Sequence, residues 1–350
     1  MQEPIISADS HINIWQVAAG DGSRDYADVF LRFGVILVGP GSLGNYFTNK
    51  DAYNKSESGA YRSFLEPFAE KISVGDLVAL KRPRSDQWEI VAIGEVRSDY
   101  VHQEVFEDVE GWDLQHCREV HWKVPDATTL VSGLTRGTLK RVYNEQALTE
   151  IRRIWASGRD LASEPIPAKS EPITVDEVIE SLIVDGLPGQ RAELIAKTIW
   201  RLRRMAKYYG DHGAEVGEHE IRTFLIVPLL MSLGWAEQRV KIEWGNMDVV
   251  LFDTPYKKGS KPVMIIESKR LFDGMRYAPE QAKGYARSFP SCDRFVVSDG
   301  IRYKLFRREG DDWRYAAYMS LTAPKRNHPY ERTVEGAVAF FRSVIPSGIS

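Results

Sequence analysis

Two carboxylates and a lysine stand at the ends of two short apolar runs in the second half of the chain. Asp248 opens the first run, and the second run ends in Glu267-Ser268-Lys269 after a polar loop with turn signals. Successive side chains of a strand point to opposite faces, so Glu267 and Lys269 are expected on one face and Ser268 on the other. If the two runs pair as a hairpin, Asp248 and Glu267 approach each other.

Two neighbouring carboxylates repel each other unless a divalent cation lies between them. Mg²⁺ binds one or two carboxylates and completes its coordination with water and phosphate oxygens. Lys269 could then stabilise an attacking water or the charge that builds on phosphorus. The spacing of Asp248, Glu267 and Lys269 predicts the outline of a phosphodiester-hydrolysing site. On these residues alone, the alternative of a charged strand end facing solvent stays open.

The segments on either side of this pattern have helical periodicity. The preceding segment, which stops at Gly234, carries an apolar side chain every four residues: Ile221, Leu225, Leu229 and Leu233. After the pattern, Gln281 and Tyr285 lie four residues apart, so they are expected on one helix face.

The order of these elements resembles the PD-(D/E)xK nucleases, in particular the nuclease domain of type I restriction motor subunits and their free-standing relatives. The resemblance covers about residues 215 to 308. It implies an α/β nuclease domain with leading helices, and Mg²⁺ as the cofactor, with Mn²⁺ as a substitute. It implies that the metal is bound by Asp248, by Glu267 and by the carbonyl oxygen of Ser268.

The same resemblance implies catalytic roles for further residues. Lys269 would orient or activate the water. Glu218 would complete the metal shell or act as a base, with Glu220 as its competitor. Gln281 and Tyr285 would contact the phosphate or the scissile strand.

The first 125 residues have short alternating strands separated by glycine turns, which favours a small mixed β-barrel. Their order resembles the PUA superfamily, especially its EVE-like members, through Trp15, Gly75-Asp76, Gly94-Glu95-Val96 and Arg118 with Trp122. This resemblance implies a compact barrel that binds RNA or holds a modified base flipped from DNA.

A pocket for a flipped base needs flat side chains for stacking and polar groups for the base edge. Aromatic residues also fill the interiors of small barrels, so each one has a core alternative. Trp112 stands in a polar loop, where a core role is unexpected. The expected base-binding residues are Trp112, Trp15, Asp28, Tyr100 and Arg118.

The composition is that of a globular protein, with 43% hydrophobic and 27% charged residues. The longest apolar runs are far too short to span a membrane, and no secretory signal is evident at the N-terminus. The two cysteines cannot form a four-ligand zinc site by themselves, and a disulfide is not expected. A cytoplasmic location is therefore expected.

The expected organisation is a barrel domain over 1–157, a proline-containing linker over 158–173 and a nuclease domain over 174–347. The net charge of −3 gives no global attraction to nucleic acid. However, Lys197, Arg201 and Arg204 fall on one face of an expected helix, opposite its apolar stripe. They are expected to contact the DNA backbone, with a solvated helix face as the alternative.

Together these features predict a modification-dependent DNA restriction endonuclease. The first domain would capture a modified base in double-stranded DNA, expected to be a cytosine derivative, and the second would cut the backbone. Cutting both strands with one active site per chain would need two protomers, so a homodimer is expected. The alternatives are an RNA-directed nuclease and a non-catalytic nucleic-acid-binding protein with a nuclease-like scaffold.

Overall fold

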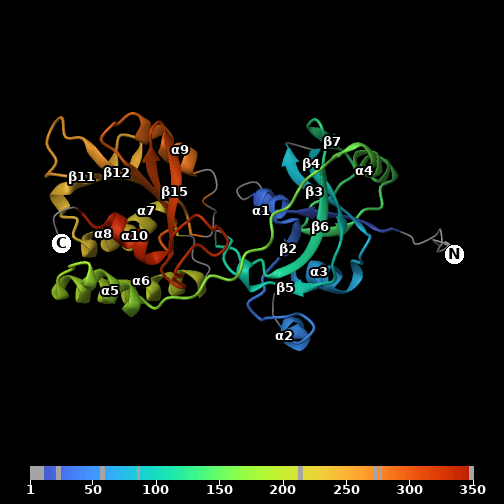
Figure 1. The fold of residues 1–350 in the computed structure, drawn as a ribbon, viewed down its shortest axis with the longest axis horizontal. Helices are drawn as coiled ribbons and strands as arrows, with labels where there is room; N and C mark the ends of the chain where they lie inside the picture. The colour runs from blue at the N-terminus through green and yellow to red at the C-terminus, as the bar shows by residue number, and fades with distance from the viewer. Residues whose placement is uncertain are drawn as a thin grey trace, which may run out of the picture. The chain divides into compact units, whose positions relative to one another are not determined.

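A computed structural model of the 350-residue chain describes residues 12–20, 25–55, 60–84, 87–109, 111–211, 216–271, 275 and 278–346. The expected start of the nuclease-like stretch at 215 and its domain end at 347 lie outside these residues. The chain divides into two compact units, Met1–Ile166 and Pro167–Ser350. Figure 1 shows the elements of both units.

Unit 1 is built on a curled mixed sheet (Figure 1), whose main path runs β2-β6-β4-β3-β1-β8. The strand pair β1·β3 is parallel, and the other pairs are antiparallel. Three short strands join the path from the side, with β5 and β9 on β6 and β7 on β4. The strands are β1 Ile14–Ala18, β2 Val35–Val38, β3 Leu77–Arg84, β4 Gln87–Val96, β5 Val101–His102, β6 His116–Val124, β7 Thr129–Val131, β8 Leu139–Arg141 and β9 Arg159–Asp160.

Unit 1 also contains helices and short helical turns. They are α1 Ala27–Phe33, α2 Lys50–Lys55, α3 Ala60–Glu66 with a π-helical turn Pro67–Lys71, a 3₁₀ turn Glu104–Phe106, and α4 Glu145–Ser157. The side chain of Asn144 caps α4 by accepting a hydrogen bond from the amide of Ala147. The apolar face of α4 packs on the sheet through Ala147, Ile151 and Ile154.

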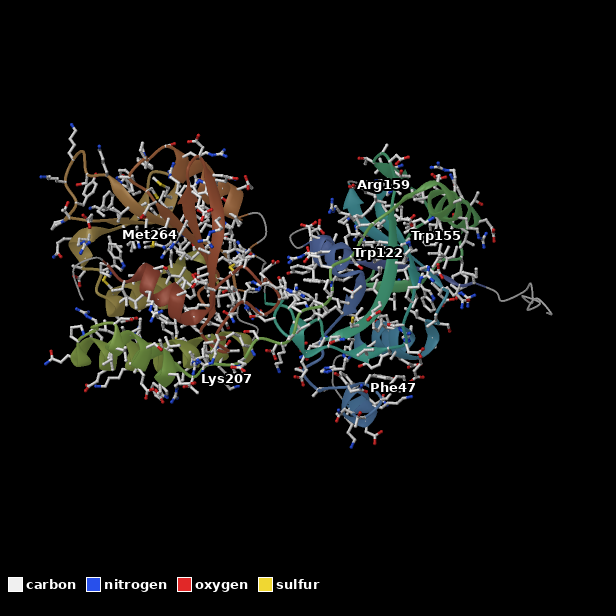
Figure 2. All side chains as sticks on the ribbon, viewed as in Figure 1. Phe47, Trp122, Trp155, Arg159, Lys207 and Met264 are labelled. Carbon is white, nitrogen blue, oxygen red and sulfur yellow. The ribbon has the colours of Figure 1, made fainter. Side chains whose placement is uncertain are left out.

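Three of the residues that carry the resemblance to the PUA superfamily, Trp15, Gly94 and Trp122, pack inside unit 1. Trp15 is 4% exposed, and its indole nitrogen donates to Asp76 at 2.9 Å. Gly94 pairs with Trp122 across β4 and β6, and a Cβ at Gly94 would lie 2.6 Å from the Trp122 ring. Only glycine fits there, so the glycine at position 94 is explained by the close packing of the buried Trp122 ring. Trp122 lies inside unit 1 in Figure 2.

Unit 2 is a six-stranded sheet in the order β10-β11-β12-β13-β14-β15. The central pair β12·β13 is parallel and the others are antiparallel. The strands are β10 Val240–Trp244, β11 Met247–Phe252, β12 Pro262–Ser268, β13 Arg294–Ser298, β14 Arg302–Glu309 and β15 Asp312–Ser320.

Helices pack on both faces of this sheet. They are α5 Val175–Val184, α6 Gly189–Asp211, α7 Glu218–Ile221 continued by the π-helical turn Arg222–Ile226 and α8 Val227–Leu233, the 3₁₀ turn Glu237–Arg239, α9 Ala278–Arg287 and α10 Ala337–Val344. One apolar cluster joins α5, α6, α8 and α10 to one face, and a second joins α9 to the other.

The apolar runs in β11 and β12 are continuous because both faces of these strands are covered. Val249 and Leu251 belong to the cluster under α6 and α8, whereas Val250 and Phe252 belong to the cluster under α9. Met264 of β12 lies inside the unit (Figure 2). Burial of each such side chain stabilises the fold by about 1.5–3 kcal/mol. Because Asp248 and Glu267 lie on these same buried strands, their backbone positions are fixed by the packing of the core.

The structure bears out a mixed α and β protein with two sheets. The sheet of unit 1 is a curled half-barrel rather than the closed barrel that was expected. Its end strands, β2 and β8, do not pair with each other among the described residues. The expected linker 158–173 begins within unit 1, since β9 pairs with β6 and the units divide after Ile166. None of the described helices is long and apolar enough to cross a membrane.

Candidate functional site

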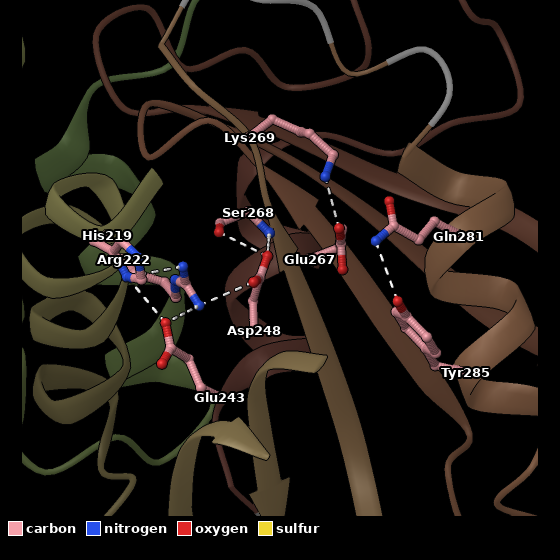
Figure 3. A network of polar contacts seen from close by, with 9 residues as sticks. All are labelled: His219, Arg222, Glu243, Asp248, Glu267, Ser268, Lys269, Gln281 and Tyr285. Atoms are coloured by element: carbon pink, nitrogen blue, oxygen red, sulfur yellow. Dashed lines mark hydrogen bonds and ion pairs between the residues drawn. The ribbon is translucent and has the colours of Figure 1, made fainter. Parts of the chain in front are cut away.

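The hairpin expected from the two apolar runs is present in unit 2. β11 and β12 pair in antiparallel register, with Val249 opposite Ile266. This register places Asp248 beside the end of β12, where its Oδ2 accepts hydrogen bonds from the amide and the hydroxyl of Ser268, both at 2.7 Å. Figure 3 shows this contact at the ends of the two strands.

Glu267 points to the face of β12 opposite to that of Ser268, as the strand alternation predicts, and its side chain meets Lys269. The Nζ atom of Lys269 donates to Oε1 of Glu267 at 2.6 Å. Glu267 is 2% exposed, and its Oε2 atom has no hydrogen-bond partner among the described residues. Burial raises the pKa of Glu267, and the charges of Asp248 and Glu218 raise it further, whereas Lys269 lowers it. Lys269 therefore compensates the negative charge of Glu267 only in part.

A buried arginine holds the other oxygen of Asp248. Nη1 of Arg222 lies 2.9 Å from Oδ1 of Asp248 and 3.4 Å from Oε1 of Glu243. The Nδ1 atom of His219 lies 2.9 Å from the same Glu243 oxygen (Figure 3). Glu243 has a φ of 54°, the only positive value among the described non-glycine residues. Backbone in this region costs about 1–3 kcal/mol, so the surrounding contacts hold Glu243 against a local preference.

His219, Arg222 and Glu243 contact one another beside Asp248, and none of them is among the site residues expected from the sequence. Arg222 lies four residues after Glu218 on the same helix face, which is a signal that was present in the sequence. No pattern in the sequence points to Glu243. Its left-handed backbone conformation depends on how β10 pairs with β11, which the sequence of β10 alone does not show.

The two competing acids of the leading helix, Glu218 and Glu220, both lie on α7. Burial raises the pKa of Glu267, and the charge of Glu218 adds a small part to that rise. Burial also raises the pKa of Tyr209, and the charge of Glu220 adds to it. The assignment of Glu218 to the site, with Glu220 as its competitor, stays a prediction.

Gln281 and Tyr285 share one face of α9, where the Gln281 amide donates to the Tyr285 hydroxyl at 3.3 Å. Figure 3 shows this pair on the side of α9 that faces Glu267.

The donor set suits a hard divalent cation that keeps most of its water. Among the described residues, no group of three or more histidine, cysteine or acidic side chains is placed to form a metal cage. Mg²⁺ does not require such a cage, because one or two carboxylates with water and substrate phosphate complete its coordination. The buried Oε2 atom of Glu267 is the feature that such a cation would satisfy.

Unit 1 contains a mainly apolar cavity of about 340 Å³ near Trp112. Its walls come from the ends of β1 and β2 and from α1, and they include Tyr26, Phe30 and Phe64. Trp112 is 37% exposed, so one part of its ring is accessible to a ligand. It closes a tight turn in which Val109 and Trp112 bond to each other's backbone, and Gly111 has a φ of 100°. The local sequence thus fixes the tryptophan at the rim of the cavity.

The other expected base-binding residues are not among the residues that line this cavity. Trp15 is in the core, as described above. Arg118 is 2% exposed and donates to the carbonyl oxygens of Phe68 and Ala69, so it caps the π-helical turn. Asp28 is exposed on α1.

Tyr100 belongs to a polar and aromatic cluster beside the sheet. Its hydroxyl contacts Nδ1 of His116 at 2.7 Å and accepts from the amide of Tyr46. Burial lowers the pKa of His116 to about 4, so the imidazole is neutral at pH 7. The contacts of Tyr100 organise the segment around α2.

The basic face of α6 is present as expected. Lys197, Arg201 and Arg204 are exposed, whereas Ile195, Ile199 and Leu202 on the opposite side are buried. The ion pair between Lys197 and Glu193 is 3.9 Å long and largely exposed, so it contributes little.

Comparisons with known proteins give limited matches. A family model described as a domain of unknown function (DUF8426) matches residues 15–144, which lie within unit 1. No curated protein matches the chain significantly. Among solved structures, the chain is similar to the YTH domain of the Zygosaccharomyces rouxii MRB1 protein in complex with N6-methyladenosine RNA. That match has 13% identity and a TM-score of 0.26, and it covers 45% of this chain and 96% of that one. This degree of similarity establishes neither a shared fold nor a shared ligand.

Proposed function

We propose that this protein is a metal-dependent endonuclease that recognises a modified base in double-stranded DNA through unit 1 and hydrolyses the backbone in unit 2. One observation carries the proposal: the fold brings Asp248, Glu267 and Lys269 to neighbouring strand ends. Glu267 is buried there with one oxygen atom unpartnered among the described residues.

In this proposal each side chain of the site has a separate role. Asp248 and Glu267 hold the cation, and the Ser268 carbonyl is a further ligand. The bound Mg²⁺ supplies a low-pKa water and neutralises the charge that develops on phosphorus. Lys269 lies 2.6 Å from Glu267, so its ammonium group can orient the attacking water beside the metal ligand.

The leading helix and α9 complete the arrangement. Glu218 adds a third acid near the site, as a base or as a further ligand. Gln281 and Tyr285, which contact each other on α9, would contact a phosphate or the scissile strand. Arg222 fixes the orientation of Asp248 and balances its charge before the cation binds.

For unit 1, the cavity beside Trp112 supports a role in base recognition. Its mainly apolar, aromatic lining and its volume of about 340 Å³ suit a flat ligand of the size of a base, because small-molecule sites are typically mostly apolar with a few polar groups. We infer that a cytosine derivative flipped from the duplex stacks on Trp112 there.

Digestion of defined substrates tests the whole proposal. Duplexes that carry single cytosine modifications should be cut in Mg²⁺ or Mn²⁺, whereas the unmodified duplex and reactions in EDTA should not. Transfer RNA in the same buffer distinguishes an RNA-directed nuclease. Sedimentation of the protein on a modified duplex shows whether two protomers assemble to cut both strands.

Trp112→Ala should remove the preference for modified DNA. Stacking of a base on an aromatic ring is worth about 1–3 kcal/mol, so the preference should fall by roughly 5- to 150-fold. Binding is measured in EDTA with matched modified and plain duplexes. Trp112→Phe should keep part of the preference. Leu130→Ala is a control at an exposed apolar residue of unit 1 outside the cavity. An unchanged preference in Trp112→Ala would exclude the cavity as the base site.

A further inference from the structure

An exposed tryptophan stands in the middle of the basic face of α6. Trp200 is 61% exposed, although tryptophan is one of the costliest side chains to leave in water. Lys197, Trp200, Arg201 and Arg204 follow one another at helical steps of three, one and three residues, so they share one side of the helix. The Arg204 guanidinium carbon lies 4.8 Å from the centre of the Trp200 ring. The indole and the cations therefore form one combined surface.

Trp200 also forms one wall of a groove of about 570 Å³ within unit 2. The other walls are the start of α5 and the segment that follows β15. The lining includes Pro172, Ile173, Ile199 and Pro324 beside the tryptophan. The groove has an apolar part beside the indole, and its volume exceeds that of a single base.

The charge around the groove selects the class of ligand. The outward face of α6 carries the exposed cations Lys197, Arg201, Arg204 and Lys207, together with the exposed acid Glu193. Such a surface attracts a polyanion, because each neutralised phosphate releases bound counterions. The groove itself is lined by one acid, Asp176, and by two cations, Arg203 and Lys325. Phosphates are expected on the helix face because Lys197, Arg201 and Arg204 are exposed there.

We propose that this face of α6 binds single-stranded nucleic acid, with one unpaired base stacked on Trp200 in the groove and the phosphates on Lys197, Arg201 and Arg204. Single-stranded sites typically combine a basic track with aromatic platforms. A paired base cannot use the platform, because its faces are covered by its neighbours in the duplex. This site is separate from the cavity at Trp112, and its binding does not depend on the proposed cleavage chemistry.

Anisotropy titrations of the full chain in EDTA test the proposal with three labelled 12-mers: oligo-dT, oligo-U and an abasic strand with the same phosphates. The wild type should bind oligo-dT and oligo-U more tightly than the abasic strand. Trp200→Ala should lower the affinity for oligo-dT by about 5- to 150-fold and leave the abasic strand unaffected. Trp200→Phe should restore part of the difference, which separates loss of stacking from misfolding.

The cations should behave differently from the indole. Arg201→Ala with Arg204→Ala should weaken binding to all three strands and reduce the salt slope by about 1.4, since each phosphate contact on a single strand contributes about 0.7. Glu193→Gln on the same face is the matched control, and it should leave binding equal or tighter. Trp112→Ala should leave the preference for oligo-dT over the abasic strand unchanged.

Two results would overturn the proposal. One is a wild type that binds the abasic strand as tightly as oligo-dT. The other is a folded Trp200→Ala variant that keeps the wild-type preference. Neither bears on cleavage of modified duplexes, so the failure of this site and the failure of the proposed nuclease function are distinguishable. A difference between oligo-dT and oligo-U shows which sugar the site accepts better.

Discussion

Lys269→Ala is expected to slow the cleavage of modified DNA by about 100- to 10,000-fold, the range for loss of a group that assists proton transfer. Two effects act in the same direction. The water beside the metal loses the ammonium group that orients it, and Glu267 loses the cationic neighbour at 2.6 Å. Because Lys269 lines neither the cavity at Trp112 nor the groove at Trp200, binding of the modified duplex in EDTA should stay close to wild type. Single-turnover cleavage with saturating protein measures the loss.

Lys283→Ala provides the matched control for this experiment. Lys283 also forms ion pairs in unit 2, with Glu280 and Asp312, but away from Glu267. Its removal should leave the cleavage rate within about threefold, since both acids that Lys283 pairs with are exposed and such ion pairs contribute about 0–1 kcal/mol. A Lys269→Ala enzyme that cuts at nearly the wild-type rate would refute the assigned role of the lysine.

Glu267→Gln is expected to abolish both cleavage and the stabilisation of the protein by Mg²⁺. A ligand that binds only the folded state adds about 2.7 kcal/mol to the free energy of unfolding at 100 times its Kd. The wild type should gain stability of that order in urea unfolding, whereas the variant should gain little. Asp248→Asn should likewise lose the Mg²⁺ effect. If both variants respond to Mg²⁺ as the wild type does, the cation is bound elsewhere.

Without metal, the same substitution should not destabilise the fold. The pKa of Glu267 is raised from its usual 4.5 in the folded state, chiefly by burial. The folded protein therefore keeps this proton after the unfolded chain has released it. Stability falls as the pH rises from about 4.5 to the raised pKa, and then levels off. Glu267→Gln removes that decline, so in EDTA its stability relative to the wild type should increase over this interval.

The residues of the candidate nuclease site could be predicted because the signal is local. A buried strand alternates strictly, so the order Glu267-Ser268-Lys269 already separates the serine from the two charged side chains. Gln281 and Tyr285 meet for a similar reason, since four residues make about one helical turn. Helix α6 also shows its basic face in the sequence, because the apolar stripe that buries its other side has a regular period.

The pocket residues of unit 1 were harder to predict because their roles depend on contacts far apart in the chain. Trp15 bonds to Asp76 and Trp122 donates to the carbonyl of Phe30, so both are in the core. Trp112 reaches the cavity because a glycine turn holds it at the rim. All three are tryptophans near strands, and composition alone cannot rank them. Burial depends on which segment covers each ring.

Tertiary structure alone decided how the charges of the nuclease-like site are arranged. The sequence predicts that Asp248 and Glu267 lie near each other, but it does not predict which other side chains they contact. In the folded unit, Asp248 contacts Ser268 and Arg222, whereas buried Glu267 contacts Lys269. It also brings Glu243 to Arg222 from a strand with no signal of its own. Periodicity along one segment fixes which face a side chain takes. The partner on that face comes from another segment, and only packing of the whole unit selects it.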